Sequence, residues 1–168
     1  LEKKCFNNAK TIIANSMMVK NQIIDTYSID PDKIELIYNG IELQNSDFTK
    51  SFEKISKEFS IIKEQSIILF VGSGFKRKGV KEFLEIISRL KNKKFIAFIV
   101  GKDKNKKLYY NLSKQLNIQD KVIFTGPRTD VKDFYSISDI FLFPTHYDPF
   151  SNVVLEAMNF ENAVFTTS

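Results

Sequence analysis

Residues 67–72 read Ile-Ile-Leu-Phe-Val-Gly, a short and uninterrupted apolar run that ends in glycine. A run of this kind is typical of a strand that is buried on both faces of a sheet. The same signal returns along the chain and predicts four more strands, over Phe95–Val100, Val122–Phe124, Ile140–Phe143 and Ala163–Phe165.

Between the apolar runs, hydrophobic residues recur every three to four positions, which indicates amphipathic helices. The predicted helices carry Val80, Phe83, Leu84, Ile87 and Leu90, then Leu108, Leu112 and Leu116, and then span Val131–Ser138 and Ser151–Asn159. Parallel strands need crossover connections, so this alternation predicts a parallel sheet with helices on both faces. The expected fold is α/β and Rossmann-like.

The first forty residues show a different pattern. A strand within Ala9–Asn15, a helix over Met18–Tyr27, a turn at Asp30-Pro31-Asp32 and a strand over Lys33–Tyr38 are expected there. A Lys-rich helix follows within Phe48–Glu64. We therefore place a domain boundary near Asn39-Gly40, between residues 1–40 and 41–168. The last strand has no helix after it, which suggests that the second domain is C-terminally incomplete.

The composition is that of a soluble globular protein, with 43% hydrophobic and 27% charged residues. No apolar run approaches the roughly 20 residues that span a bilayer, and Leu1–Asn8 lack the apolar core of a signal peptide. Cys5 is the single cysteine, which fits a reducing cytoplasm. The formal charge of +5 favours anionic partners, although a solvated lysine face explains much of it.

Three predicted strand ends carry unusual residues, at the edge where open parallel sheets bind their ligands. The first is the loop Gly72-Ser73-Gly74-Phe75-Lys76-Arg77-Lys78-Gly79. Small residues let backbone amides approach a ligand, and three cations before a helix N-terminus favour phosphate. The loop lacks the spacing of a P-loop and the third glycine of a dinucleotide fingerprint. An exposed basic turn explains the same residues equally well.

The second strand end is Gly126-Pro127-Arg128-Thr129-Asp130-Val131. Its polar backbone groups suit contacts with a base. Thr129 or Asp130 at the start of a helix is also explained by a helix cap, and we prefer the cap on these residues alone.

The third strand end, Pro144–Met158, carries Asp148 in a loop and Glu156 on an otherwise apolar helix. A carboxylate at Glu156 can accept two hydrogen bonds from a ribose diol, and a helix N-terminus near Ser151-Asn152 suits a diphosphate. Asp148 would orient a sugar or act on developing charge. The alternative is that Asp148 caps the helix and Glu156 is a surface residue. His146, the single histidine, fits a loop residue better than a base.

Other kinds of site have weaker support. One cysteine and one histidine leave few metal ligands, and Asp30-Pro31-Asp32 fits a turn better than a metal–diphosphate motif, so no metal site is expected. Nucleophilic catalysis has no local signature, because no Gly-x-Ser-x-Gly occurs.

Together, these loops resemble the C-terminal half of family-4 retaining glycosyltransferases of the B-type fold, which has two Rossmann-like domains. The likeness is nearest to the glucosyltransferases of the lipopolysaccharide core. It covers most of the chain from about Ala9 and is most specific at the last of its stretches. These stretches are Gly72–Phe75 with Arg77–Gly79, Gly101–Lys104, Arg128–Val131 and Asp148–Ala157.

The resemblance implies a role for each matching residue. Lys78 would bind the donor phosphates and Glu156 the ribose hydroxyls, while the loop at Arg128 would lie beside the base. Lys78 and Asp148 are the expected catalytic residues. The expected donor-binding residues are Gly72, Ser73, Arg77, Lys78, Arg128, Phe150, Ser151, Asn152 and Glu156, with the last loop contributing backbone amides.

The resemblance also implies a reaction. A hexose, expected to be glucose, would pass from a nucleotide diphosphate sugar, expected to be a UDP-sugar, to a cell-envelope glycan or lipopolysaccharide-core acceptor with retention and without a cofactor. Residues 1–40 would end the acceptor domain and form the linker, and residues 41–168 would form the donor domain. This chain alone would then bind donor without transferring sugar. We expect a cytoplasmic protein with a peripheral contact to the inner face of the membrane, and no nucleic-acid partner.

The chain departs from the family pattern at several positions. Asp148 replaces the first Glu, Ser151 a common Gly, and Ser73 a second phosphate-binding Arg. Glu161-Asn162-Ala163 replaces the usual Gly-Leu-Pro.

Other interpretations of the fold are a sugar-nucleotide epimerase, a phosphorylase, a degenerate regulatory domain, and a non-catalytic nucleotide- or nucleic-acid-binding module. A nucleic-acid surface calls for aromatic residues between the cations, whereas the aromatic residues here follow core patterns.

Overall fold

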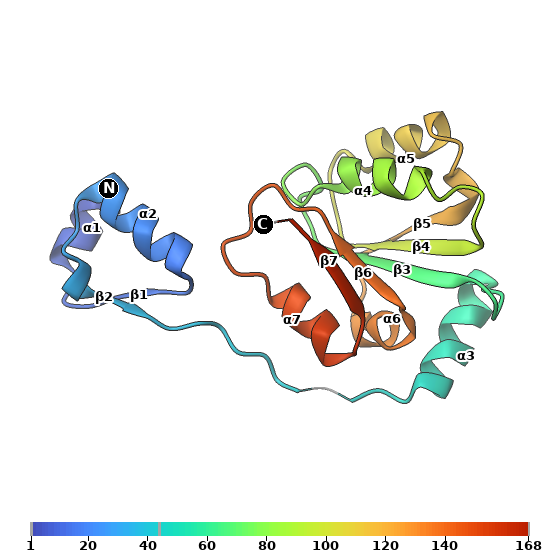
Figure 1. The fold of residues 1–168 in the computed structure, drawn as a ribbon, viewed down its shortest axis with the longest axis horizontal. Coiled ribbons are helices and arrows are strands. Elements are labelled where there is room, and N and C mark those ends of the chain that lie inside the picture. Colours follow the sequence, from blue (N-terminus) through green and yellow to red (C-terminus); the bar gives the residue numbers. More distant parts are fainter. Residues whose placement is uncertain (1, 44, 168) are drawn as a thin grey trace. The chain divides into compact units, whose positions relative to one another are not determined.

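The computed structural model describes residues 2–43 and 45–167, and their contacts divide the chain into two units. The first unit runs up to Ile41 and also includes Asp148–Asn152. The second unit comprises Glu42–Tyr147 and the chain from Val153 onward. Figure 1 shows the elements of both units along the chain.

The first unit is a small α/β layer. Its elements are α1 (Glu2–Asn8), β1 (Ile12–Ala14), α2 (Met17–Tyr27), the 3-10 turn η1 (Pro31–Lys33) and β2 (Ile34–Leu36), and the two strands pair in parallel. Ser16 caps α2 by accepting a hydrogen bond from the Val19 N–H, and Asp30 accepts one from the Asp32 N–H to form the expected turn. The sequence pattern did not predict α1, because none of its side chains is buried.

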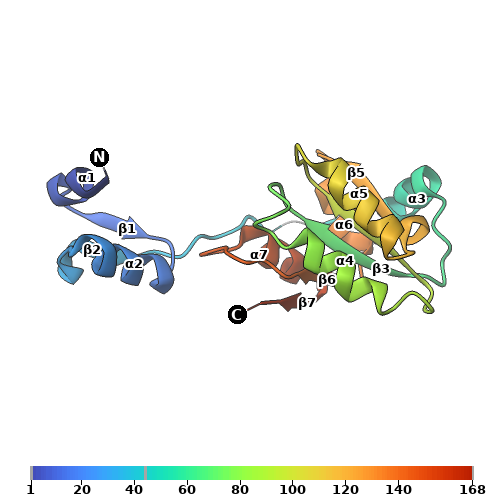
Figure 2. The same ribbon diagram turned by 90° about the horizontal axis from the view of Figure 1, so that it is seen from above.

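The second unit is a five-stranded parallel sheet in the order β5-β4-β3-β6-β7. The strands are β3 (Ser66–Val71), β4 (Phe95–Val100), β5 (Val122–Gly126), β6 (Ile140–Phe143) and β7 (Ala163–Thr166), and the helices are α3 (Phe48–Phe59), α4 (Val80–Ser88), α5 (Lys106–Gln115), the 3-10 turn η2 (Gln119–Lys121), α6 (Val131–Ile137) and α7 (Asn152–Asn159). In Figures 1 and 2, α4 and α5 cover one face of the sheet, and α3, α6 and α7 cover the other. The predicted Rossmann-like α/β fold is confirmed.

The core of the second unit lies around the two central strands. All six residues of β4 are buried, as are five of the six residues of β3, because helices cover both faces of the sheet. Phenylalanine rings join the sheet to the helices: Phe98 meets Phe134 of α6 edge-on at 5.3 Å between ring centroids, and Phe70 meets Phe83 of α4 at 5.6 Å. Burying each such ring stabilises the fold by roughly 1.5–3 kcal/mol.

The predicted face of α5 is wrong at one of its three residues, since Leu112 and Leu116 pack against the core but Leu108 does not. Leu108 of α5 is 64% exposed, while the neighbouring Tyr109 is only 6% exposed. The reason is a tertiary contact, since the Tyr109 ring packs edge-on against Phe75, with 5.4 Å between the ring centroids. Phe75 belongs to the loop after β3, so the periodicity of α5 by itself gave no sign of this partner.

The strand order places a topological switch point at the middle of the sheet. β3 comes first in sequence, β4 and β5 follow on one side of it, and β6 and β7 lie on the other side. In open α/β sheets, ligands bind outside the carboxyl ends of the strands at this reversal. A ligand site is therefore expected at the loops that follow β3 and β6.

Candidate functional site

Three loops at the carboxyl ends of the strands pack backbone against backbone, and glycines make this packing sterically feasible. Gly79 has φ of +77°, and a Cβ on it would lie 1.7 Å from the carbonyl oxygen of Pro144, just after β6. A Cβ on Gly101, after β4, would lie 2.0 Å from the carbonyl oxygen of Gly72. No side chain fits at either contact.

Hydrogen bonds join the loop after β3 to the loop after β4. The Gly74 N–H donates to the carbonyl of Lys102 at 3.2 Å, and the Lys102 N–H donates to Ser73 Oγ at 3.2 Å. The Phe75 N–H donates to the Asp103 carboxylate at 2.7 Å. Ser73, a predicted donor-binding residue, thus uses its hydroxyl oxygen within the loop structure.

Arg77 joins the same loop to the segment after β6. Its guanidinium donates to the carbonyl of Tyr147 at 2.8 Å, while its own carbonyl accepts the His146 N–H at 3.0 Å and the Thr145 hydroxyl at 3.2 Å. The imidazole Nε2 of His146 lies 3.1 Å from the carboxylate of Glu82 in the first turn of α4. These contacts fix the cationic loop between β6 and the start of α4.

Lys78 is half-buried beside this backbone framework. Its ammonium lies 5.1 Å from the centroid of the Phe143 ring, and its Cγ lies 3.6 Å from the position that a Cβ on Gly72 would take. An aromatic face attracts a cation, and a partly desolvated cation interacts more strongly with an anion than a fully hydrated one. The structure brings four predicted residues, Gly72, Ser73, Arg77 and Lys78, into one loop system at the switch point.

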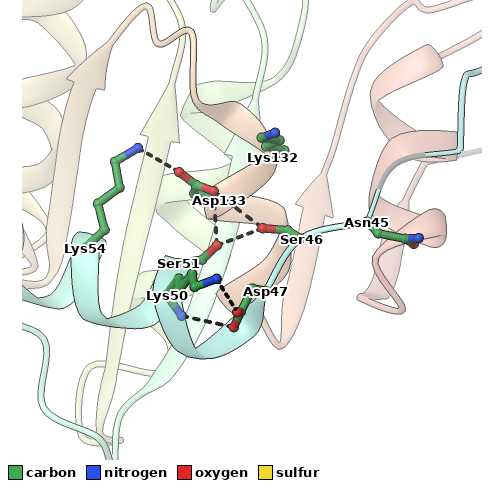
Figure 3. A pocket seen from close by; sticks show the side chains of 8 residues that line it. All are labelled: Asn45, Ser46, Asp47, Lys50, Ser51, Lys54, Lys132 and Asp133. Carbon is green, nitrogen blue, oxygen red and sulfur yellow. Dashed lines mark hydrogen bonds and ion pairs between the residues drawn. The ribbon is translucent and has the colours of Figure 1, made fainter.

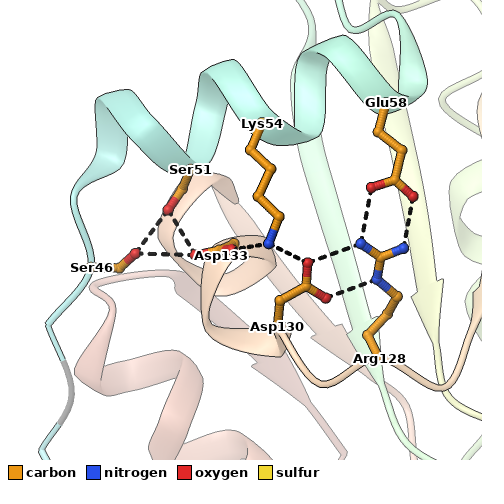
Figure 4. Close-up of polar contacts among 7 residues, drawn as sticks. All are labelled: Ser46, Ser51, Lys54, Glu58, Arg128, Asp130 and Asp133. Carbon is orange, nitrogen blue, oxygen red and sulfur yellow. Dashed lines mark hydrogen bonds and ion pairs between the residues drawn. The ribbon is translucent and has the colours of Figure 1, made fainter.

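Arg128 lies in a different set of contacts (Figure 4). Its guanidinium forms a bidentate pair with Glu58 of α3, at 2.7 and 2.9 Å, and a second pair with Asp130, at 2.8 and 2.9 Å. It also stacks over Phe134, with 5.3 Å to the ring centroid. These bonds fasten α3 to the loop that precedes α6, and the contact of this loop with a base stays a prediction.

The prediction that the Asp130 side chain caps the following helix is wrong. Asp130 occupies the N-cap position of α6, but its carboxylate makes no capping hydrogen bond and instead meets Arg128 and Lys54. The Arg128 guanidinium, assisted by Lys54, holds the pKa of Asp130 well below its ordinary value of 3.8. The carboxylate meets two cations here, whereas a cap bond would offer it only an uncharged N–H donor, which explains the preference.

A pocket of about 240 Å³ lies where α3 and α6 begin (Figure 3). Three lysines line it, but two of them face aspartates: Lys50 lies 3.2 Å from Asp47, and Lys54 lies 2.7 Å from Asp133. The Ser51 hydroxyl also donates to Asp133, at 3.0 Å. Two of the three lysine charges in this pocket are therefore compensated by aspartates of the same pocket.

Glu156 is half-buried on α7 and hydrogen-bonded, so it is not an ordinary surface residue. Its Oε2 accepts a hydrogen bond of 2.9 Å from the hydroxyl of Tyr135 on α6. Burial, followed by the charge of Glu156, raises the pKa of this tyrosine above its ordinary value of 10.0, so its hydroxyl stays protonated as a donor.

The segment Asp148–Asn152 belongs to the first unit. Within that unit, the Phe150 and Tyr38 rings lie 5.5 Å apart, and Asn39 Nδ2 donates to Asn152 Oδ1 at 3.1 Å. The Ser151 hydroxyl is buried and has no hydrogen-bond partner within the described part of the chain. The roles of Asp148, Phe150, Ser151 and Asn152 stay predictions.

Sequence reasoning missed several residues that shape these loops. Asp103 left a weak signal, as an acidic residue two positions after a strand-end glycine. Tyr135 also left a weak signal, because it adds a hydroxyl to a short helix whose other buried residues, Phe134 and Ile137, are apolar. Glu58 left none, because its partner Arg128 is 70 residues away in the chain.

Two further observations concern the whole described chain. No group of three or more His, Cys, Asp and Glu side chains that suits a metal ion occurs within residues 2–43 and 45–167. No helix in that part of the chain combines the length and apolar content needed to cross a bilayer.

Comparison with known proteins places these features in a family. Residues 51–168 match the profile of the glycosyl transferases group 1, and residues 1–45 match that of glycosyltransferase family 4. The lipopolysaccharide glucosyltransferase WaaG of Escherichia coli is 30% identical over 90% of this chain. This chain covers 43% of that enzyme, so it spans less than half the length of this curated relative.

Solved structures share the fold. A glycosyltransferase from Rickettsia africae superposes with a TM-score of 0.88 at 26% identity, over 98% of this chain and 47% of that one. HepE from Anabaena, solved in complex with UDP-glucose, gives a TM-score of 0.83 at 17% identity, over 99% of this chain and 49% of that one. At 17% identity the likeness to HepE concerns the fold alone. The resemblance inferred from the loops is confirmed, and the chain belongs to the glycosyl transferases group 1 family.

Proposed function

We propose that this chain is the donor-binding part of a glycosyltransferase that uses a nucleotide diphosphate sugar, with UDP-glucose as the donor. The observation that carries the proposal is the place of Lys78, a half-buried cation at the switch point of the sheet. A diphosphate suits this place because the lysine, the neighbouring Arg77 and the N-terminus of α4 all favour negative charge.

The named relatives support the choice of donor. WaaG is a lipopolysaccharide glucosyltransferase, and HepE was solved with UDP-glucose. By this proposal, Lys78 and backbone amides stabilise the charge that develops on the leaving diphosphate. Glu156 holds the ribose hydroxyls, Asp148 acts beside the sugar, the configuration is retained, and no metal takes part.

The proposal extends to the arrangement of the longer enzyme. Residues 1–40 would end an acceptor-binding domain and form the linker, and residues 41–168 would form the donor domain. The acceptor would be a cell-envelope glycan or lipopolysaccharide core at the cytoplasmic side of the membrane. On this view, the chain by itself binds donor and leaves transfer to the complete enzyme.

Titration calorimetry with UDP-glucose, GDP-glucose and ADP-glucose tests this proposal. We expect UDP-glucose to bind at least about tenfold more tightly than the other two, and its Kd to be the same in EDTA and in magnesium. Glu156→Ala should weaken UDP binding, whereas Glu64→Ala, which changes an exposed glutamate, should not. A folded protein that binds none of the three sugar nucleotides would overturn the proposal.

A further inference from the structure

A tyrosine that plays no part in the reaction above donates a hydrogen bond to the proposed ribose-binding carboxylate. Tyr135 is only 2% exposed, and its hydroxyl lies 2.9 Å from Glu156 Oε2. A weaker contact, 3.4 Å long, joins the same hydroxyl to the carbonyl of Val153 one turn earlier on α7. The hydroxyl therefore meets α7 at the side chain and at the backbone.

The Tyr135 ring is itself held in place. Phe160 stacks on it with 5.8 Å between ring centroids and an interplanar angle of 8°, and Phe141 of β6 lies 5.8 Å away. The backbone carbonyl of Tyr135 accepts a 2.9 Å hydrogen bond from the buried Asn162 side chain, which also donates to the carbonyl of Ser138. With the ring and the backbone both fixed, the hydroxyl oxygen is held within hydrogen-bond distance of Glu156 Oε2.

A glutamate side chain has several rotatable bonds, and fixing it costs conformational entropy. A bond to Tyr135 removes this cost before a ligand arrives. An ionised carboxylate offers about four acceptor positions, so one bond from tyrosine leaves room for the two hydroxyls of a vicinal diol. Tyr135 thus orients the Glu156 carboxylate and leaves acceptor positions on it for the ligand.

We propose that Tyr135 is a positioning residue that holds the Glu156 carboxylate for a ribose diol, and so lets the site distinguish ribonucleotides from 2′-deoxyribonucleotides. This inference rests on the proposed function, which assigns Glu156 to the ribose. A site built to accept hydrogen bonds from two hydroxyls discriminates strongly against a ligand that lacks one of them, because a buried acceptor then loses its partner.

The test compares the Kd values of UDP and 2′-deoxy-UDP for the wild type and for Tyr135→Phe. The variant keeps the ring and its stacking and removes only the hydroxyl. We expect UDP binding to weaken about tenfold, as for a lost hydrogen bond to a charged group, and 2′-deoxy-UDP binding to change less than about twofold. Tyr110→Phe removes a hydroxyl from a 43% exposed tyrosine on α5 and serves as the matched control.

A purely structural role would weaken both ligands equally, so equal losses, or no loss of UDP binding, would overturn the inference and leave the proposed function intact. Failure of the wild type to bind UDP would overturn both. A double variant, Tyr135→Phe with Glu156→Gln, should bind UDP no more weakly than Glu156→Gln alone.

Glu156→Asp provides a second test that leaves the buried tyrosine in place. It keeps the charge but shortens the reach to the Tyr135 hydroxyl by one methylene. We expect the discrimination between UDP and 2′-deoxy-UDP to fall about tenfold in this variant as well. Wild-type discrimination in Glu156→Asp would contradict the positioning role.

Discussion

Gly79 and Gly74 have nearly the same φ, +77° and +76°, but the surroundings of the two residues differ completely. A Cβ on Gly79 would meet the carbonyl oxygen of Pro144 at 1.7 Å, whereas a Cβ on Gly74 would have no atom within 4 Å. The pair separates the cost of an unfavourable φ from the cost of a blocked loop contact.

Gly74→Ala should therefore lower the free energy of unfolding by about 1–2 kcal/mol, the cost of a left-handed conformation for a residue with a Cβ. Gly79→Ala should lower it by about 3 kcal/mol or more, because the loops after β3 and β6 must also separate. Chemical denaturation of both variants measures the difference. Equal losses would show that the contact with Pro144 contributes nothing.

At Glu161 the informative substitution runs the other way, from a residue with a side chain to glycine. Glu161 is not a glycine, yet it has φ of +59° just after α7. Its N–H donates to the carbonyl of Met158, and the next N–H, that of Asn162, donates to the carbonyl of Ala157, which is the hydrogen-bond pattern of a Schellman C-cap. The turn thus keeps its geometry in spite of the glutamate.

Glu161→Gly should accordingly raise the free energy of unfolding by about 1 kcal/mol, because glycine adopts this conformation without strain. Glu161→Ala keeps the unfavourable conformation and serves as the control, with a change within about 0.5 kcal/mol. Thermal or urea denaturation measures both. A loss of stability in the glycine variant would show that the glutamate side chain makes a contact that outweighs its backbone strain.

At the scale of the elements, α3 is attached to the rest of its unit by charges as well as by apolar packing. Lys54 bridges Asp130 and Asp133 at 2.5 and 2.7 Å, while Glu58 pairs with Arg128. The pKa of Asp130 lies below 3.8 in the folded chain, chiefly because of Arg128. Its carboxylate therefore stabilises the fold above that pH, and this contribution is lost as the pH falls through the folded pKa.

Asp130→Asn removes the contribution that the ionised Asp130 carboxylate makes to the free energy of unfolding. The difference in unfolding free energy between wild type and variant should be constant from neutral pH down to about pH 4.5 and should shrink at more acidic pH. Urea denaturation over a pH series measures it. On an Arg128→Met background the pH-dependent part should be smaller, because the main cause of the shift is gone. A difference that stays constant to the lowest pH would contradict the assignment.

The elements show what sequence patterns can and cannot predict. Strands such as Ile67–Val71 were predicted to within a residue or two, because continuous burial leaves a continuous apolar run. The exposed Leu108 was misassigned because periodicity does not reveal the tertiary partner of a helix. The pairing of Arg128 with Glu58 was missed because charged residues far apart in the chain leave no local pattern.

At the scale of the whole molecule, the proposed site depends on the order of the strands. β3 and β6 are neighbours in the sheet although Ile140 and its strand partner Ile68 lie 72 positions apart in sequence, since 140 − 68 = 72. The loops after β3 and β6 are neighbours because β4 and β5 are added on one side of β3 and β6 is added on the other side. The candidate residues Gly72, Arg77 and Lys78 were found from their types, but the backbone contacts that hold them required the structure.

The central claim is that the cationic loop after β3 binds the diphosphate of a nucleotide sugar. The most direct measurement is the Kd for UDP of the wild type, Lys78→Ala and Lys57→Ala by titration calorimetry. Lys57→Ala is the matched control, because it removes an exposed lysine on α3. We predict that Lys78→Ala weakens UDP binding at least about tenfold, as for a lost charge-assisted bond, while Lys57→Ala leaves it unchanged. Equal Kd values for UDP in the wild type and in a folded Lys78→Ala variant would contradict the claim.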